Sequence, residues 1–256
     1  MRILLFSGTT EGNKIAEFLS AYPVKVYLSV ATEYGRACAA EGENVEVISG
    51  RMTREEIENF IHEHDIAMVI DATHPFARQV SVSAKEAAER CGAEYVRCLR
   101  EASVWDQRDG ENVVIVESVG EAARFLCRTE GRILIATGSK ELQEYTVIED
   151  YEKRCYVRVL ATREAIDKAT AMGIDGSHII AMQGPFSQEM NTATLRHVKA
   201  EWFVTKESGK SGGFEEKLAA AREANVKLVV VDRPQEEGIS LQELCQMIRK
   251  EWLVAR

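Results

Sequence analysis

The stretch Arg2-Ile3-Leu4-Leu5-Phe6-Ser7-Gly8-Thr9-Thr10-Glu11-Gly12 joins a short apolar run to a loop that contains glycine. The run 2–6 is typical of a buried strand, and residues 11–20 have the spacing of an amphipathic helix. A strand, a glycine loop and a helix in this order predict the first unit of an α/β fold with a parallel sheet.

The same alternation of short apolar runs and longer amphipathic segments continues along the chain. Thr53, followed by Glu56 three residues later, predicts a helix that starts with a capping box. Phe214, Leu218 and Ala221 form one apolar helix face. Further strands are expected at 24–28, 45–48, 66–70, 94–97, 113–116, 132–136, 156–160, 179–182, 202–204 and 226–231, and further helices at 53–62, 76–91, 118–127, 163–172, 188–199, 214–224 and 240–251.

The segment 100–112 interrupts this alternation, because Trp105, Asp106, Asp109 and Gly110 follow no clear period. We interpret it as the crossing between two domains, at 1–105 and 106–256. The expected architecture is therefore α/β, with two Rossmann-like domains, mainly parallel sheets and an interdomain cleft. The two halves show no sequence repeat.

Composition narrows the function classes. The 256 residues carry a formal net charge of −9, and 45% of them are hydrophobic, which predicts a globular protein and argues against nucleic acid as partner. No apolar run approaches the ~20 residues that cross a bilayer, and the apolar start is too short for a signal peptide, so we expect no membrane partner and a cytoplasmic protein. Six cysteines without a CxxC pair are expected to be reduced thiols. No metal-ligand spacing occurs, and no metal site is expected.

Parallel sheets bind ligands beyond the carboxyl ends of their strands. The first such loop holds Gly8, Thr9, Thr10 and Gly12, spaced as GxxxG rather than GxGxxG. Glycines let the backbone approach a phosphate at the helix N-terminus, but an ordinary tight turn is an equally good interpretation.

Two further loops in the first half carry polar groups. After the second strand, Thr32 and Arg36 stand where a dinucleotide fold would bind the ribose, with no acid at the strand end. This favours a 2′-phosphate, and hence NADP over NAD, although Arg36 as a plain surface residue fits as well. The loop 71–77 contains His74 at a strand end and Pro75 at the expected first helical position, with Thr73 or His74 as the cap.

The second half has three loops rich in glycine and hydroxyl groups, at 137–140, 184–187 and 205–213. Their donors suit an anionic ligand, and flexible turns are the alternative. Gly-Lys-Ser at 209–211 is no P-loop, since Val204 stands where the first glycine is required. The YxxxK pattern does not occur in the chain.

Taken together, these loops resemble the precorrin-6A and cobalt-precorrin-6A reductases of cobalamin biosynthesis. The matching segments are 8–12, 71–77, 184–187, 205–206 with 208–209 and 212–213, and 229–234, so the resemblance covers most of the chain. Ser7 departs from the pattern, because family members often have glycine there.

The resemblance implies reduction of one C=C bond of an anionic, partly methylated tetrapyrrole, with hydride from NADPH or NADH. The substrate's carboxylates call for cations at strand ends, for which Lys210 is a further candidate. The resemblance does not indicate the oligomeric state or whether the macrocycle holds cobalt. On this basis we expect cofactor binding by Gly8, Thr9, Thr10, Gly12, Thr32, Arg36, Asp71 and Thr73, substrate binding by Arg78, Ser139, Lys140, Ser187, Ser208, Gly209, Gly212 and Arg233, and catalysis by His74 or Lys206, with water as another proton donor.

Two other functions remain open at this point. A nucleotide- or S-adenosylmethionine-dependent transferase would use the same first glycine loop. A two-domain module that closes on an anionic solute would explain the polar loops without catalysis.

Overall fold

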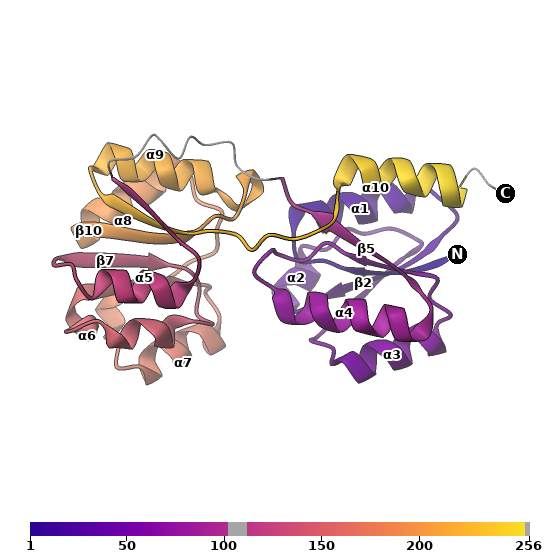
Figure 1. The fold of residues 1–256 in the computed structure, drawn as a ribbon, viewed down its shortest axis with the longest axis horizontal. Coiled ribbons are helices and arrows are strands. Elements are labelled where there is room, and N and C mark those ends of the chain that lie inside the picture. Colours follow the sequence, from indigo (N-terminus) through magenta and orange to yellow (C-terminus); the bar gives the residue numbers. More distant parts are fainter. Residues whose placement is uncertain (102–111, 254–256) are drawn as a thin grey trace. The chain divides into compact units, whose positions relative to one another are not determined.

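The chain folds into two compact units in a computed structural model that describes residues 1–101 and 112–253 (Figure 1). The first unit combines residues 1–101 with 235–256, and the second spans 102–234. The expected second domain, 106–256, therefore ends too late, because the chain returns to the first unit after Pro234. The expected boundary at 105/106, with Trp105, Asp106, Asp109 and Gly110, lies outside the described residues.

The first unit is a parallel sheet with helices on both faces. Its strand order is β12-β5-β4-β1-β2-β3, and every pair in it is parallel. The strands are β1 (Arg2–Phe6), β2 (Lys25–Val30), β3 (Val45–Ser49), β4 (Met68–Asp71), β5 (Glu94–Leu99) and β12 (Ile239–Ser240). The helices are α1 (Thr10–Ser20), α2 (Glu33–Ala37), α3 (Arg54–Glu63), α4 (Arg78–Cys91) and α10 (Leu241–Met247), which runs on as a π-helical turn at Ile248–Leu253.

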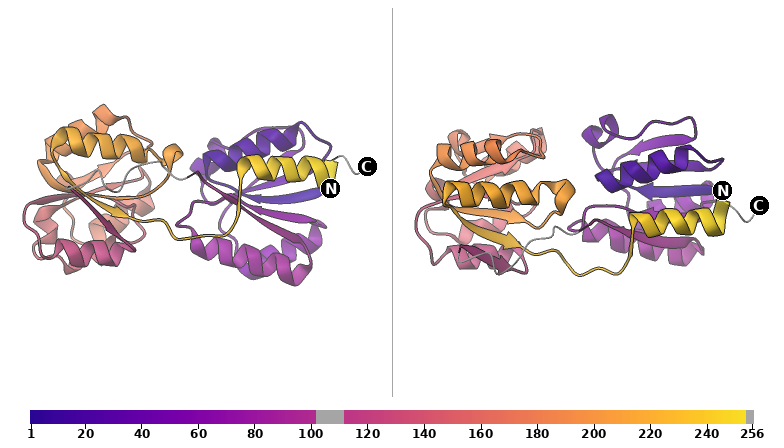
Figure 2. Two further views of the ribbon diagram at one scale, coloured as in Figure 1. Left: turned by 45° about the horizontal axis from the view of Figure 1, so that its top comes forward. Right: turned by 90° about the horizontal axis from the view of Figure 1, so that it is seen from above.

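Alternate side chains of the strands build two cores. Ile3 and Leu5 of β1 pack with Leu19 of α1 and with Leu244 and Ile248 from the C-terminal segment. On the opposite face, side chains of β1 pack against α3 and α4. Both views in Figure 2 place α10 beside α1, as the core contacts require. A segment distant in sequence thus completes this core.

The second unit is built the same way, with strand order β6-β11-β10-β7-β8-β9 and only parallel pairs. Its strands are β6 (Val113–Val116), β7 (Arg132–Ala136), β8 (Cys155–Val159), β9 (Ile179–Ala181), β10 (Ala200–Lys206) and β11 (Lys227–Val231). Its helices are α5 (Val119–Leu126), α6 (Tyr151–Arg154), α7 (Arg163–Ala171), α8 (Gln188–Val198) and α9 (Phe214–Ala224), with a 3₁₀ segment at Leu142–Val147.

The two sheets share a strand order that the sequence does not reveal. Read outward, β3-β2-β1-β4-β5 in the first unit corresponds to β9-β8-β7-β10-β11 in the second. Both are the Rossmann order, which confirms the expected fold class. In each, the order reverses between two central strands, β1 and β4 or β7 and β10, where such sheets bind ligands.

Most predicted elements are confirmed to within a few residues. The capping box of Thr53 and Glu56 is present, and the apolar face of α9 is buried as expected. The start of α4 was predicted wrongly: it begins at Arg78, and Ala77 precedes it without a side-chain cap. Asp71 holds the preceding loop in a separate turn, so neither Thr73 nor His74 caps the helix and Pro75 lies outside it. The short α2 and the 3₁₀ segment were not predicted.

Within the described residues, no helix has the length and apolar character to cross a membrane. All six cysteines are free thiols, as expected.

Candidate functional site

The glycine loop of the first unit lies between β1 and β4, at the reversal of strand order. Thr9 is the N-cap of α1, and its hydroxyl accepts a hydrogen bond from the Gly12 amide at 3.1 Å. The same hydroxyl donates to the carbonyl of Ala72 at 2.6 Å. Thr9 therefore ties the loop after β1 to the loop after β4.

This loop has the geometry of an anion cradle. Gly8 has φ +105°, and a Cβ there would meet no atom within 4 Å, so its exposed backbone borders open space. The hydroxyl of Ser7 is buried and has no hydrogen-bond partner in the described part of the chain. A Cβ on Gly12 would lie 2.1 Å from Ser7 Oγ, so Gly12 allows α1 to approach the strand end closely. These features fit the phosphates of a dinucleotide at the N-terminus of α1.

An acidic group also lies in the first turn of α1. Glu11 is buried and accepts a hydrogen bond from Arg100 Nε at 3.0 Å. Arg100 follows β5, so the ion pair connects this turn to a strand two positions away in the sheet. Arg100 thereby offsets a carboxylate that would otherwise repel an anion at the loop.

The polar groups after β2 lie at the same sheet edge. Thr32 accepts a hydrogen bond from the Gly35 amide at 3.0 Å and so starts α2. Arg36 is exposed, and its Nη1 lies 3.4 Å from the hydroxyl of Ser49 at the end of β3. The described side chains leave this guanidinium accessible to a ligand at the edge.

Asp71, expected to bind cofactor, is fully buried at the end of β4. Its carboxylate accepts hydrogen bonds from the amide and hydroxyl of Thr73 at 3.0 and 2.7 Å. It also accepts from Tyr95 at 3.0 Å and from Arg97 at 3.0 Å. Asp71 and Thr73 therefore shape the loop after β4 through hydrogen bonds within the protein.

Arg97 extends this network to the returning C-terminal segment. Its Nη2 donates to both carboxylate oxygens of Glu236, at 3.1 and 3.0 Å. Burial lowers the pKa of Arg97, but Asp71 and Glu236 outweigh that effect, and the net shift is upward. The pKa of Tyr95 is also raised, mainly by burial and then by Asp71. The network thus keeps Arg97 charged between two carboxylates.

His74 lies in the loop that Asp71 shapes. Its Nδ1 accepts a hydrogen bond from the Phe76 amide at 3.3 Å, so the neutral ring carries its proton on Nε2. Four residues later, Arg78 begins α4 and is exposed. These two residues extend the polar edge of the first unit beyond β4.

In the second unit, the loop after β7 meets the end of β10. Gly138 has φ +84° and borders open space, Ser139 is half-buried and Lys140 is exposed. Lys206, the last residue of β10, forms an ion pair with Glu141. The expected catalytic Lys206 therefore has a carboxylate partner in the loop after β7.

The loop after β10 is held by Glu207, which is buried. Its carboxylate accepts the Gly209 amide at 3.0 Å and pairs with Arg233 after β11. Ser208 donates to the carbonyl of Gly212 at 3.0 Å. Arg233 and Ser208, both expected to bind substrate, thus also stabilise this loop.

The loop after β9 includes a cis peptide bond between Gly184 and Pro185. Ser187 is the N-cap of α8 and accepts from the Met190 amide at 3.3 Å. Asn191, one turn into α8, donates to the carbonyls of Phe186 and Ser187 at 3.2 and 2.9 Å. The amide side chain of Asn191 thereby holds this loop against its helix.

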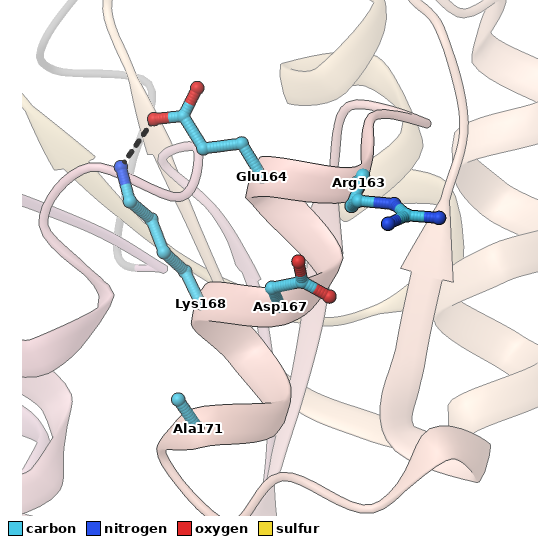
Figure 3. Close-up of a pocket in the computed structure, with 5 residues that line it drawn as sticks. All are labelled: Arg163, Glu164, Asp167, Lys168 and Ala171. Carbon is cyan, nitrogen blue, oxygen red and sulfur yellow. Dashed lines mark hydrogen bonds and ion pairs between the residues drawn. The ribbon is translucent and has the colours of Figure 1, made fainter.

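A separate hollow lies along α7 and has none of these features (Figure 3). All of its lining residues come from successive turns of α7. Lys168 forms an exposed ion pair there with Glu164 at 2.7 Å. Its lining residues are Arg163, Glu164, Asp167, Lys168 and Ala171. We assign no function to this hollow, because it lies along a single helix and its lining residues are exposed to water.

The comparisons with known proteins agree with this geometry. The model of the family "Precorrin-6x reductase CbiJ/CobK" matches residues 2–249. The chain belongs to this family. The cobalt-precorrin-6A reductase of Priestia megaterium is 32% identical over 92% of the chain and 91% of its own length. That of Methanothermobacter thermautotrophicus is 35% identical over 92% of the chain and 77% of its own length.

Among solved structures, a precorrin-6A reductase, CobK, matches this member of the precorrin-6x reductase family with a TM-score of 0.75. The match covers 97% of this chain and 96% of that one at 23% identity, which supports the two-unit fold. Relatives in this family are precorrin-6A or cobalt-precorrin-6A reductases. A reductase requires a hydride source such as a nicotinamide cofactor.

Sequence reasoning missed several charged residues that organise these edges. Arg97 and Arg158 each look like an ordinary polar residue in a strand, and Glu236 looks like part of a polar linker. A charged residue inside an apolar strand was the one available signal, since such side chains are seldom buried without a partner.

Proposed function

We propose that this protein reduces one C=C bond of the precorrin-6A macrocycle, or of its cobalt complex, with NADPH as the hydride donor. Membership of the reductase family carries the proposal, and the two polar sheet edges supply groups that suit its two ligands. NADPH rather than NADH, the individual site residues and a cytoplasmic location are part of the proposal.

The first unit is the proposed cofactor unit. The amides around Gly8 and the N-terminus of α1 would bind the pyrophosphate. Thr10 and Thr32 would donate further hydrogen bonds, and Arg36 would bind the 2′-phosphate. Asp71 and Thr73 act indirectly by holding the loop after β4. When bound, the nicotinamide supplies the hydride.

The second unit is the proposed source of contacts to the substrate's carboxylates. Ser139, Lys140, Ser187, Gly209 and Gly212 lie in loops at the carboxyl ends of neighbouring strands. Their amides, hydroxyls and ammonium group are donors that match carboxylates. From the first unit, Arg78 adds a cation near His74.

A proton must also reach the carbon next to the one that receives hydride. His74 is the first candidate donor, through Nε2; this role requires the imidazolium form and therefore release of the Phe76 amide from Nδ1. Lys206 is the second candidate, held by Glu141 at the end of β10. Both stay proposals, and general acid action needs the donor within hydrogen-bond reach of the substrate.

The direct test incubates the protein with NADPH and precorrin-6A, with and without cobalt, and follows the visible spectrum of the macrocycle. We expect a spectral change coupled to NADPH oxidation in one of the two arms. An unchanged spectrum in both arms would reject the function. Reduction with NADH at equal efficiency would reject the cofactor preference alone.

The role of Arg36 is tested by Arg36→Met. We expect KM for NADPH to rise roughly tenfold, as for loss of one charged hydrogen bond, while kinetics with NADH stay the same. Arg54→Met is the matched control, because Arg54 is engaged by Glu55 and Glu86 on α3. An equal effect of Arg36→Met on both cofactors would place Arg36 away from the 2′-phosphate.

A further inference from the structure

Three arginines are buried among the described residues, and one of them differs from the other two. Arg97 pairs with Asp71 and Glu236, and Arg100 pairs with Glu11. Arg158 of β8 is 6% exposed and has no carboxylate partner among the described residues. A buried cation without a counter-charge is costly, so this position calls for an explanation.

The surroundings of Arg158 are polar on one side and aromatic on the other. Nη1 donates to Asn191 Oδ1 at 2.8 Å. The guanidinium carbon lies 4.3 Å from the ring centre of Phe186 and 5.7 Å from that of Phe203. Burial lowers the pKa of Arg158 to about 10. The neutral amide and the rings orient the guanidinium but leave its charge unmatched.

Two of its nitrogens remain available to a ligand. Nε and Nη2 have no hydrogen-bond partner among the described residues. Neither atom is fully buried, so a ligand can reach both. Arg158 is the last but one residue of β8, so it lies at the carboxyl edge of the sheet. Its guanidinium packs against Phe186 of the loop 183–187. An incoming oxyanion would complete its hydrogen bonds and its charge.

The same edge exposes apolar side chains, which indicates the kind of molecule that carries the oxyanion. Leu160 follows β8, Met182 follows β9, and Met190 lies in the first turn of α8; they are 47%, 36% and 43% exposed. The Met182 amide donates to the carbonyl of Val159, so the ends of β8 and β9 adjoin. An apolar surface beside an unmatched buried cation suits a flat ring system with carboxylates on its rim.

We propose that Arg158 binds a peripheral carboxylate of the tetrapyrrole substrate, held in position by Asn191 and Phe186, with Leu160, Met182 and Met190 available to the ring. The inference rests on the proposed function and adds a substrate-binding residue to it. A phosphate of the cofactor is the competing source of an oxyanion, and the experiment separates the two.

The test compares Arg158→Met, Arg158→Lys and Arg124→Met, in the full-length protein. Arg124 is a matched control, because it is 69% exposed on α5 and pairs with Glu121. Fluorescence titration measures the affinity for uroporphyrin, a stable tetrapyrrole octacarboxylate, and a separate titration measures that for NADPH. Thermal unfolding verifies that each variant is folded.

We expect Arg158→Met to bind uroporphyrin roughly ten- to a hundredfold more weakly, as for loss of one charge-assisted hydrogen bond in a desolvated place. The affinity of Arg158→Met for NADPH should equal that of the wild type. Arg124→Met should bind both ligands as the wild type does. Arg158→Lys keeps the charge but loses the forked contact, so we expect roughly three- to tenfold weaker binding. If Arg158→Met does not fold, the uroporphyrin affinity of Arg158→Lys tests the proposal by itself.

Wild-type affinity for uroporphyrin in folded Arg158→Met, or in Arg158→Lys alone, would overturn the proposal. A loss of NADPH affinity with unchanged porphyrin affinity would overturn it as well and assign Arg158 to the cofactor. Failure of the function itself is distinct: the wild type would then bind uroporphyrin but leave precorrin-6A unreduced. With turnover, Arg158→Met should raise KM for precorrin-6A more than it lowers kcat.

Discussion

Asp71 shows why the identity of a residue at a strand end does not reveal its role. The sequence places a carboxylate where ligands bind, and the structure encloses it with Thr73, Tyr95 and Arg97. A buried carboxylate needs several hydrogen-bond donors to offset its loss of hydration, and Asp71 has them. We therefore expect Asp71 to act on a ligand indirectly, through the loop that contains His74.

Cys98 provides a prediction about pH at the same scale. Burial raises the pKa of its thiol from 9.0 to about 12. Between these values the unfolded chain has lost the proton and the folded chain keeps it, so the unfolded state binds fewer protons. The free energy of unfolding should therefore fall as pH rises from about 9 towards 12, by at most about 1.4 kcal/mol per pH unit from this thiol.

Urea unfolding at several pH values above 8 tests this expectation with Cys98→Ala. The variant should lose less stability per pH unit than the wild type. Cys127→Ala is the control, because it removes an exposed thiol in place of a buried one. Equal slopes for Cys98→Ala and wild type would contradict the prediction.

At the scale of elements, the contact between α1 and the end of β1 depends on one glycine. Thr9 fixes where α1 begins, and Gly12 allows the helix to pass close to Ser7. The two glycines of the loop thus have separate roles. Gly8 adopts a positive φ, and Gly12 leaves room for the close approach of α1 to Ser7.

Gly12→Ala tests the second part. The new Cβ would lie 2.1 Å from Ser7 Oγ and 2.8 Å from Ser7 Cβ, so α1 or the loop must move. We expect a loss of about 1–3 kcal/mol in the free energy of unfolding, as for overpacked cores, together with weaker NADPH binding. Urea unfolding and a cofactor titration measure the two effects.

The second substitution Ser7→Gly should restore much of the loss in Gly12→Ala, because it removes the two nearest atoms. Gly120→Ala serves as the control in α5, where the nearest neighbour of a Cβ is the end of the flexible Glu144 side chain at 3.2 Å. A Gly12→Ala variant as stable as the wild type would show that the close approach does not constrain this loop.

At the scale of the whole molecule, the chain builds one unit from two separate pieces. The first unit contains residues 1–101 and the C-terminal segment from 235 onward, while the second is continuous. Leu244 is fully buried in the core beside α1, and Arg97 binds Glu236 across 139 residues of sequence. The last helix is therefore part of the proposed cofactor unit.

Leu244→Ala tests this assignment. Truncation of a fully buried leucine should cost about 2–5 kcal/mol. Hydrogen exchange should then become faster in β1, β2, β4 and β5, with β7, β10 and β11 little changed. Leu218→Ala in α9, whose leucine packs in the core of the second unit, should produce the reverse pattern. Faster exchange in the second unit on Leu244→Ala would contradict the assignment.

The sequence by itself determined the class of fold, most strands and helices, and the loops at the strand ends, because each of these depends on local periodicity, glycine and capping groups. The capping box at Thr53 and the apolar face of α9 were predicted for that reason. The family resemblance also rests on short segments that keep their order along the chain.

Only the tertiary structure decided which polar residues pair and which stay available. Asp71 is enclosed, Glu11 is neutralised by Arg100, and Arg158 is left with a neutral partner, and each depends on residues brought together by the sheet. The repeated strand order and the return of the chain to its first unit have the same origin. Long-range contacts leave no periodic trace in a sequence, since the two partners are selected by where the strands meet in space.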